Sequence, residues 1–133
     1  MRAMILAGFA CAALAGCGDS NKSAPFDQAK WDQGAKSYER RCAGCHHSPW
    51  SGNKGSKTGP HIADLDGRKA ASIRGFNYSK AMRQSKIKWD ATTLDSFMKR
   101  PKTYIPGTKM VIDAITDEAE RAALSYFIFT KKP

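Results

Sequence analysis

The sequence has few acidic residues, few cysteines, no internal repeat and no glycine-rich motif of the kind that binds phosphate. Asp and Glu number 12 against 22 Lys and Arg, so the formal net charge is +10, which favours acidic partners such as nucleic acid, anionic lipid or an acidic protein surface. Only one closely spaced cysteine pair is present, which argues against a four-cysteine zinc site. With 133 residues, 41% hydrophobic and 26% charged, the chain makes one domain and is neither disordered nor a polytopic membrane protein.

The first seventeen residues lack charge almost entirely. Arg2 is the only charged residue before position 19, and residues 3–15 are apolar or small, a run too short for a stable membrane-spanning helix. The run ends in residues 14–17, Leu-Ala-Gly-Cys, which resemble a bacterial lipobox. We therefore expect residues 1–16 to be a signal peptide and Cys17 to be acylated. An ordinary signal peptide with an incidental cysteine is the alternative.

The next segment is polar and contains Gly, Ser and Pro, so residues 17–26 are predicted to be a lipid-anchored tether. About eight extended residues reach roughly 25–29 Å. The domain that follows, residues 27–133, is therefore expected to work close to the periplasmic side of a bacterial membrane. Whether this is the inner or the outer membrane is left open by the sequence.

Residues 42–46 read Cys-Ala-Gly-Cys-His, the attachment signature of a c-type haem. On a helical turn the two thiols lie on one side, where they can meet the two vinyl groups of a porphyrin edge, and the adjacent imidazole points at the iron. A thioredoxin-like site would need a βαβ context, which is absent. A disulfide between Cys42 and Cys45 stays open at this point but gives His46 no role.

The iron position opposite His46 requires a second ligand, and three methionines follow the tether. Met82 lies in a basic stretch, and Met98 has helical spacing with Leu94, which is typical of a core residue. Met110 ends a Pro-Gly loop far from His46 in the sequence, so the loop can bring a thioether to the opposite haem face. Sulfur ligation stabilises ferrous iron.

From about Trp31 to Lys131 the chain resembles the mitochondrial cytochrome c family and its close bacterial relatives. Besides the haem-attachment pentapeptide, the matching segments are residues 57–60, 67–69, 75–79, 87–89 and 104–110. The resemblance implies an all-α, class I cytochrome c fold. In this fold four to five helices wrap around one covalently bound haem c, and the first and last helices cross, here at Gly34.

The resemblance also implies the roles of the site residues. Cys42 and Cys45 attach the haem, His46 and Met110 are the axial ligands, and the carbonyl of Pro60 orients the imidazole. The remaining cofactor-binding positions surround the buried propionates, which need donors or a cation; they are Arg68, Tyr78, Ser79 and Trp89.

Some positions depart from the family pattern. Phe97 stands where a Tyr usually reaches the Met sulfur, so we expect an altered redox potential, which a redox titration of Phe97→Tyr would test. Met82 and Ile112 also replace the usual residues. Two extra imidazoles, His47 and His61, are expected to be exposed.

Three helices are predicted around the haem. The first spans about residues 27–42 and the second begins near Asp90 or Thr92 and stops before Pro101. The third begins with Thr116 as the N-cap and ends with Lys131 and Lys132, so that acidic and basic residues match the helix dipole. The side chains expected to face inward are Trp31, Ala35, Tyr38, Leu94, Phe97, Met98, Leu124, Phe127 and Ile128.

Axial ligation by His and Met leaves no open iron position, so the sequence predicts a one-electron carrier between respiratory or photosynthetic complexes, with no enzymatic activity. By resemblance, its partners are acidic docking surfaces of the quinol–cytochrome c oxidoreductase and a terminal oxidase, approached through Lys57, Lys102 and Lys109. The alternative is a small c-type haem peroxidase, which would need Met110 to leave the iron. We expect a monomer that binds no nucleic acid, because an exported chain without a recognition motif has no such partner.

Overall fold

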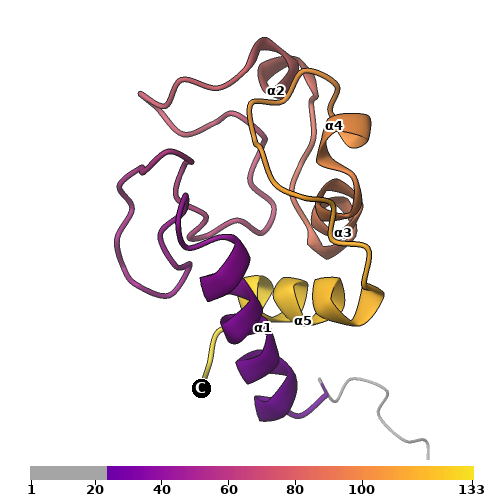
Figure 1. Cartoon of the computed structure of the whole chain (residues 1–133). Coiled ribbons are helices and arrows are strands. Elements are labelled where there is room, and N and C mark those ends of the chain that lie inside the picture. The colour runs from indigo at the N-terminus through magenta and orange to yellow at the C-terminus, as the bar shows by residue number, and fades with distance from the viewer. Residues whose placement is uncertain (1–23) are drawn as a thin grey trace, which may run out of the picture.

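The computed structural model describes residues 24–133 and contains five helices and no strand within that range. The helices are α1 (Gln28–Arg41), α2 (Lys80–Gln84), α3 (Ala91–Lys99), α4 (Pro101–Tyr104) and α5 (Glu118–Phe129). Long loops join α1 to α2 and α4 to α5 (Figure 1). The expected all-α architecture is therefore confirmed. The predicted signal peptide, Cys17 and most of the predicted tether lie outside the described residues, within which no helix is long and apolar enough to cross a membrane.

Helices α1 and α5 cross closely, as Figure 1 shows, and they form the most extensive helix pair of the molecule. Gly34 lies at the crossing, where a Cβ atom would fall 2.6 Å from the Cβ of Phe127 and still closer to the carbonyl of Ala123. Only glycine permits this approach without moving the backbone of α5. The predicted crossing at Gly34 is confirmed.

The starts of α1 and α3 follow from their capping residues. Asp27 accepts a hydrogen bond from the Lys30 N–H at 2.9 Å, and Cys42 is the C-cap of α1, so the predicted bounds agree with the structure. Asp90 caps α3 and forms a capping box with Thr93. Side chains placed this way satisfy N–H groups that have no partner within the helix.

The last helix was predicted to start one residue too early and to end three residues too late. Asp117, and not Thr116, is the N-cap, because its carboxylate accepts from the N–H groups of Ala119 and Glu120. At the other end α5 stops at Phe129, and no basic residue lies in its last turn.

Two indole N–H groups take the place expected for lysines at the C-terminal end of α5. Trp50 donates to the Phe127 carbonyl at 2.8 Å, and Trp31 donates to the Thr130 carbonyl at 3.1 Å. Both carbonyls belong to the last turn or the residue after it, where helical partners run out. Neutral donors therefore satisfy the end of this helix.

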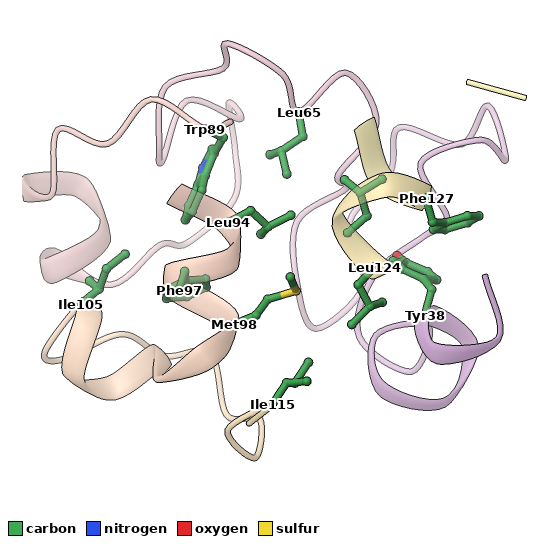
Figure 2. Packing of buried hydrophobic residues seen from close by; sticks show 11 residues of the cluster. Tyr38, Leu65, Trp89, Leu94, Phe97, Met98, Ile105, Ile115, Leu124 and Phe127 are labelled. Carbon is green, nitrogen blue, oxygen red and sulfur yellow. The ribbon is translucent and has the colours of Figure 1, made fainter. Parts of the chain in front are cut away.

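The core lies where α1, α3 and α5 meet (Figure 2). Tyr38 and Leu124 are fully buried, and the rings of Tyr38 and Phe127 have centroids 5.3 Å apart. On the α3 side, Phe97 packs against Trp89 with centroids 5.4 Å apart. The side chains expected to face inward all belong to this cluster or pack against it.

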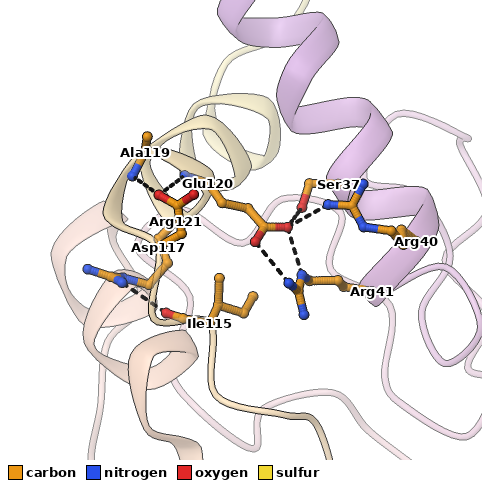
Figure 3. Close-up of polar contacts among 8 residues, drawn as sticks. All are labelled: Ser37, Arg40, Arg41, Ile115, Asp117, Ala119, Glu120 and Arg121. Carbon is orange, nitrogen blue, oxygen red and sulfur yellow. Dashed lines mark hydrogen bonds and ion pairs between the residues drawn. The ribbon is translucent and has the colours of Figure 1, made fainter.

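A second link between α1 and α5 is ionic. The carboxylate of Glu120 accepts hydrogen bonds from Ser37, Arg40 and Arg41 (Figure 3), with Arg41 bound through two nitrogens at 2.7 and 2.9 Å. The hydrogen bonds from these donors lower the pKa of Glu120 to about 2, and the bond from Arg41 has the largest effect. The neighbouring Arg121 is buried and bonds to Asp95 of α3 at 2.8 Å, so α5 is tied to helices on both sides.

Candidate functional site

A cavity of about 280 Å³ opens between the end of α1, the loop that follows it, α2, α3 and the loop before α5. Its walls contain much apolar surface, including Leu65, Leu94 and Phe97. The nine residues that the sequence assigned to cofactor binding all line this one cavity: Cys42, Cys45, His46, Pro60, Arg68, Tyr78, Ser79, Trp89 and Met110. The fold thus brings together residues separated by up to 68 positions in the chain.

The two cysteines lie on one turn that continues α1. The N–H groups of Cys45 and His46 both donate to the Cys42 carbonyl, at 3.0 and 2.9 Å. Neither cysteine is in a disulfide. Burial raises the pKa of the Cys42 thiol to about 11, so it stays protonated. Two thiols on one turn suit addition to two vinyl groups.

The imidazole of His46 is held by the segment that contains Gly59 and Pro60. Its Nδ1 lies 2.7 Å from the Pro60 carbonyl, and a proton on Nδ1 leaves the Nε2 lone pair for a metal. Burial lowers the pKa of His46, which favours this neutral form. A Cβ atom at Gly59 would lie closest to Cε1 of the His46 ring, 2.7 Å from Nδ1 and 2.8 Å from Nε2. The imidazole therefore fills the space that a side chain at position 59 would occupy.

Met110 reaches the cavity from the loop that follows α4. The Thr108 N–H donates to the Ile105 carbonyl at 3.0 Å, and Gly107 has a φ of +88°, a left-handed conformation that a glycine adopts easily. The Met110 N–H then donates to the Thr108 hydroxyl at 3.2 Å. One imidazole and one thioether in an apolar cavity, with two thiols beside them, are a donor set that fits a covalently attached haem.

Among the four residues expected near the propionates, Arg68, Ser79 and Tyr78 show how a side chain at the cavity wall can be fixed or kept as a donor. Arg68 donates to the carbonyls of Ala63 and His61 at 2.7 and 2.9 Å, which fixes the guanidinium at the cavity wall. The Ser79 hydroxyl accepts from the Met82 N–H at 3.0 Å as the N-cap of α2, which leaves its own proton free to donate. Burial raises the pKa of Tyr78, which keeps its hydroxyl a donor.

The expected exposure of the two extra histidines was wrong. His61 is buried, 8% exposed, and its Nδ1 has no hydrogen-bond partner among the described residues. The His61 carbonyl accepts a hydrogen bond from Arg68 at 2.9 Å. His47 is half-buried, and its carbonyl accepts from Tyr38 at 2.9 Å. Neither imidazole lines the cavity.

Two residues at the site were not assigned by sequence reasoning. Gly59 was named only as part of the matching segment 57–60, although its place between Thr58 and Pro60 could have indicated close packing. Val111 is 81% exposed beside Met110 and lines the mouth of the cavity. An exposed valine next to an expected ligand gave no pattern from which this position could be inferred.

Comparisons with known proteins agree with the site. The family model for cytochrome c matches residues 31–132. The chain is 37% identical over 103 residues to a cytochrome c of Cochliobolus lunatus, covering 77% of this chain and 94% of the relative. It is 41% identical over 95 residues to cytochrome c2 of Rhodoplanes tepidamans, covering 71% and 86%. The solved structure of cytochrome cH from Methylobacterium extorquens matches with a TM-score of 0.67 and 29% identity over 75% of this chain and 97% of that one. The chain therefore belongs to the cytochrome c family of electron carriers and binds one haem c covalently.

Proposed function

We propose that the protein is a lipid-anchored one-electron carrier on the periplasmic side of a bacterial membrane, with His46 and Met110 as the axial ligands of its haem iron. The observation that carries the ligation is the shared cavity. His46, with its Nδ1 already bonded to the Pro60 carbonyl, and Met110, from a distant loop, line the same space as Cys42 and Cys45. When bound, the haem would supply the iron centre that accepts one electron and later releases it.

The protein side chains hold the cofactor and set its environment. His46 donates from Nε2, and the thioether of Met110 favours the ferrous state. Ligands on both faces leave no position for a substrate, which suits a carrier. Apolar walls, including Phe97, limit water around the metal, and a lower dielectric strengthens the effect of each nearby charge.

Four side chains are assigned to the haem propionates. Arg68 supplies positive charge from a position fixed by two backbone carbonyls. Ser79, Tyr78 and Trp89 supply O–H or N–H donors at the same cavity. Buried carboxylates with such partners remain charged without a large cost.

The ligation is tested by absorption spectroscopy of ferric protein with Met110→Ala. In this family, ferric haem with a thioether ligand shows a weak far-red band, and we expect the variant to lose it. Met82→Leu is the matched control, because Met82 lines the same cavity and is not assigned to the iron. A far-red band that survives in Met110→Ala would show that another group ligates the iron.

The anchor is tested by mass spectrometry of protein extracted from membranes. We expect one haem on residues 42–46 and acyl chains on Cys17. Cys17→Ser should move the holoprotein to the soluble periplasmic fraction, because acyl chains bind the bilayer by about 0.8 kcal/mol for each buried methylene. A chain that carries haem but has an unmodified N-terminal segment would contradict the anchor and leave the carrier function standing.

The proposed partners are acidic surfaces of the quinol–cytochrome c oxidoreductase and a terminal oxidase. Lys57, Lys102 and Lys109 are exposed, and Lys57 and Lys109 flank or line the cavity. Long-range attraction of this kind speeds encounter and is screened by salt. Turnover with an oxidase should therefore fall steeply with ionic strength, and a flat salt profile would contradict this role for the lysines.

A further inference from the structure

The net positive charge of the described residues comes from one segment of the chain. Residues 67–112 contain eleven Lys and Arg and only two Asp and Glu. The remaining described residues, 24–66 and 113–133, contain nine of each. The half that carries α2, α3 and α4 is therefore strongly basic, whereas the half built from α1 and α5 is neutral overall.

A shallow depression, largely open to solvent, lies in this basic half, between the end of α2 and the segment that ends α4. Ala81, Ile87, Ile105 and Pro106 provide apolar walls, and Tyr104 is 39% exposed at its edge. None of its lining residues belongs to the haem cavity. We call this feature the α2–α4 groove.

The residues that line the α2–α4 groove are uncharged, and two exposed lysines lie next to them in the sequence. Lys86 is exposed and stands between Ser85 and Ile87, which both line the groove. Lys80 is exposed and lies four residues before the lining residue Gln84, on the same face of α2. Of the two acidic residues in the basic half, Asp95 is paired with Arg121, and Asp90 caps α3. Hardly any negative charge competes for these lysines.

Lys86 adopts a conformation that its residue type does not favour. Its φ is 54°, in the left-handed region where glycine is the usual occupant. A lysine at this place costs stability that a glycine would not. Lys86 therefore occupies a strained backbone position between two residues that line the groove.

Helix α2 separates the groove from the haem cavity. Ser79 and Met82 line the haem cavity, whereas Ala81, Gln84 and Ser85 line the groove. One helix, about 10 Å across with its side chains, therefore stands between the two spaces. A protein bound in the groove would lie one helix away from the haem pocket, a short path for an electron.

We propose that the α2–α4 groove is a second docking surface, for an acidic segment of a redox partner protein, in addition to the mouth of the haem cavity. The inference rests on the electron-carrier function. The charge of the segment around the groove fits an acidic partner. Its place fits a protein and not the carrier's own membrane, because α2 and α4 lie at the opposite end of the molecule from the start of α1, which follows the proposed anchor in the chain (Figure 1).

The first test maps binding by NMR on ferrous holoprotein, with poly-L-glutamate as the acidic probe at low salt. We expect the largest shifts at groove residues such as Ala81, Ile87 and Ile105, with reversal at high salt. Shifts that cluster only around Val111 and Lys109 would place all acidic docking at the cavity mouth and overturn the proposal. An absence of shifts would overturn it as well.

The second test compares variants. Lys80→Glu with Lys86→Glu should weaken poly-L-glutamate binding about tenfold, since exposed ion pairs contribute a few tenths of a kcal/mol to about 1 kcal/mol each. The matched control, Lys131→Glu with Lys132→Glu, changes the net charge equally in the neutral half and should alter binding less than twofold. Equal weakening in both pairs would mean that net charge alone binds the probe, and would overturn the groove.

Lys86→Gly separates docking from folding. The variant should melt at a higher temperature because the left-handed backbone is relieved, and should still bind poly-L-glutamate more weakly. Unchanged binding would contradict the role of Lys86. Binding to phosphatidylglycerol vesicles is measured to test whether the groove binds a membrane. If Lys80→Glu with Lys86→Glu abolishes binding to these vesicles, the groove is assigned to lipid instead. Haem content and redox potential, measured on every variant, show whether the carrier itself is intact.

Discussion

Gly59 and Pro60 fix the His46 ring from two directions. The Pro60 carbonyl accepts from one ring nitrogen, and the missing side chain of Gly59 leaves the space that the ring fills. The Gly59 N–H also donates to the Cys45 carbonyl at 2.8 Å. The haem-attachment turn and the segment that orients its histidine are therefore joined at a single residue.

Gly59→Ala should disturb this arrangement. The new Cβ would overlap the imidazole ring of His46. Overpacking of this kind lowers the free energy of unfolding by about 1–3 kcal/mol. We expect a lower yield of holoprotein, measured by the haem chromogen, and a lower melting temperature. Gly44→Ala is the control, because no atom lies within 4 Å of a Cβ there. Identical yields and melting temperatures for the two variants would contradict the packing role of Gly59.

At the level of helices, the contact between α1 and α5 combines close backbone approach with an ionic cluster. Gly34 permits the approach, and the carboxylate of Glu120 collects three donors from α1. The two features lie on the same pair of helices but respond to different perturbations. A steric change should act at every pH, whereas the ionic cluster should depend on acidity.

Gly34→Ala should destabilise the protein although alanine is the better helix former by about 1 kcal/mol. The obstruction is the backbone of α5, which no side-chain rotation can relieve. We expect a melting temperature below that of the parent. The control is Gln33→Ala, an exposed position on the same helix, which should melt at or above the parent. A rise in both variants would show that α1 and α5 can separate at little cost.

Glu120→Gln should change the acid stability. The folded-state pKa of Glu120 is about 2 and its reference value is 4.5. Because the folded pKa is the lower one, the stabilisation is fully present above about pH 4.5 and is lost as the pH falls towards 2. The variant should be less stable at pH 7, and its stability should fall less between pH 4.5 and 2. Chemical unfolding at several pH values measures this, with exposed Glu118→Gln as the control.

The bounds of the helices were largely open to prediction from the sequence because capping residues mark them. Asp27 and Asp90 precede apolar periodicity and do cap their helices. The start of α5 was misplaced because Thr116 and Asp117 are both good N-caps, and only the folded chain shows which side chain bonds. Its end was misplaced because the indoles of Trp31 and Trp50, distant in sequence, supply the donors.

Across the whole molecule, the haem-binding residues were predicted from the family pattern and the spacing of short motifs. The structure adds what spacing does not encode. His61 is buried although its polar side chain predicts exposure, and the α2–α4 groove depends on two segments about twenty residues apart that meet in space. Long-range packing of this kind leaves no local signal.

The cofactor should act as part of the core. The haem cavity separates core side chains of α3 from those of the haem-attachment turn. Without covalent haem, Cys42→Ala with Cys45→Ala should leave these apolar walls facing water, and we expect loss of cooperative melting by circular dichroism. Cys42→Ser alone keeps one attachment site and should retain a melting transition. A haem-free chain that melts cooperatively at the parent temperature would contradict this.

The indole of Trp50 bonded to the Phe127 carbonyl has a practical consequence for engineering. Residues 51–56 are all exposed and line no part of the haem cavity, and the chain around them is fixed by Trp50 before the loop and by the Gly59 bond to Cys45 after it. Extra length in a loop whose ends stay fixed adds little entropic cost. A peptide tag or a fluorophore attachment sequence inserted there should leave both the cofactor pocket and the α1–α5 pair undisturbed, which makes this loop the natural place to label the protein.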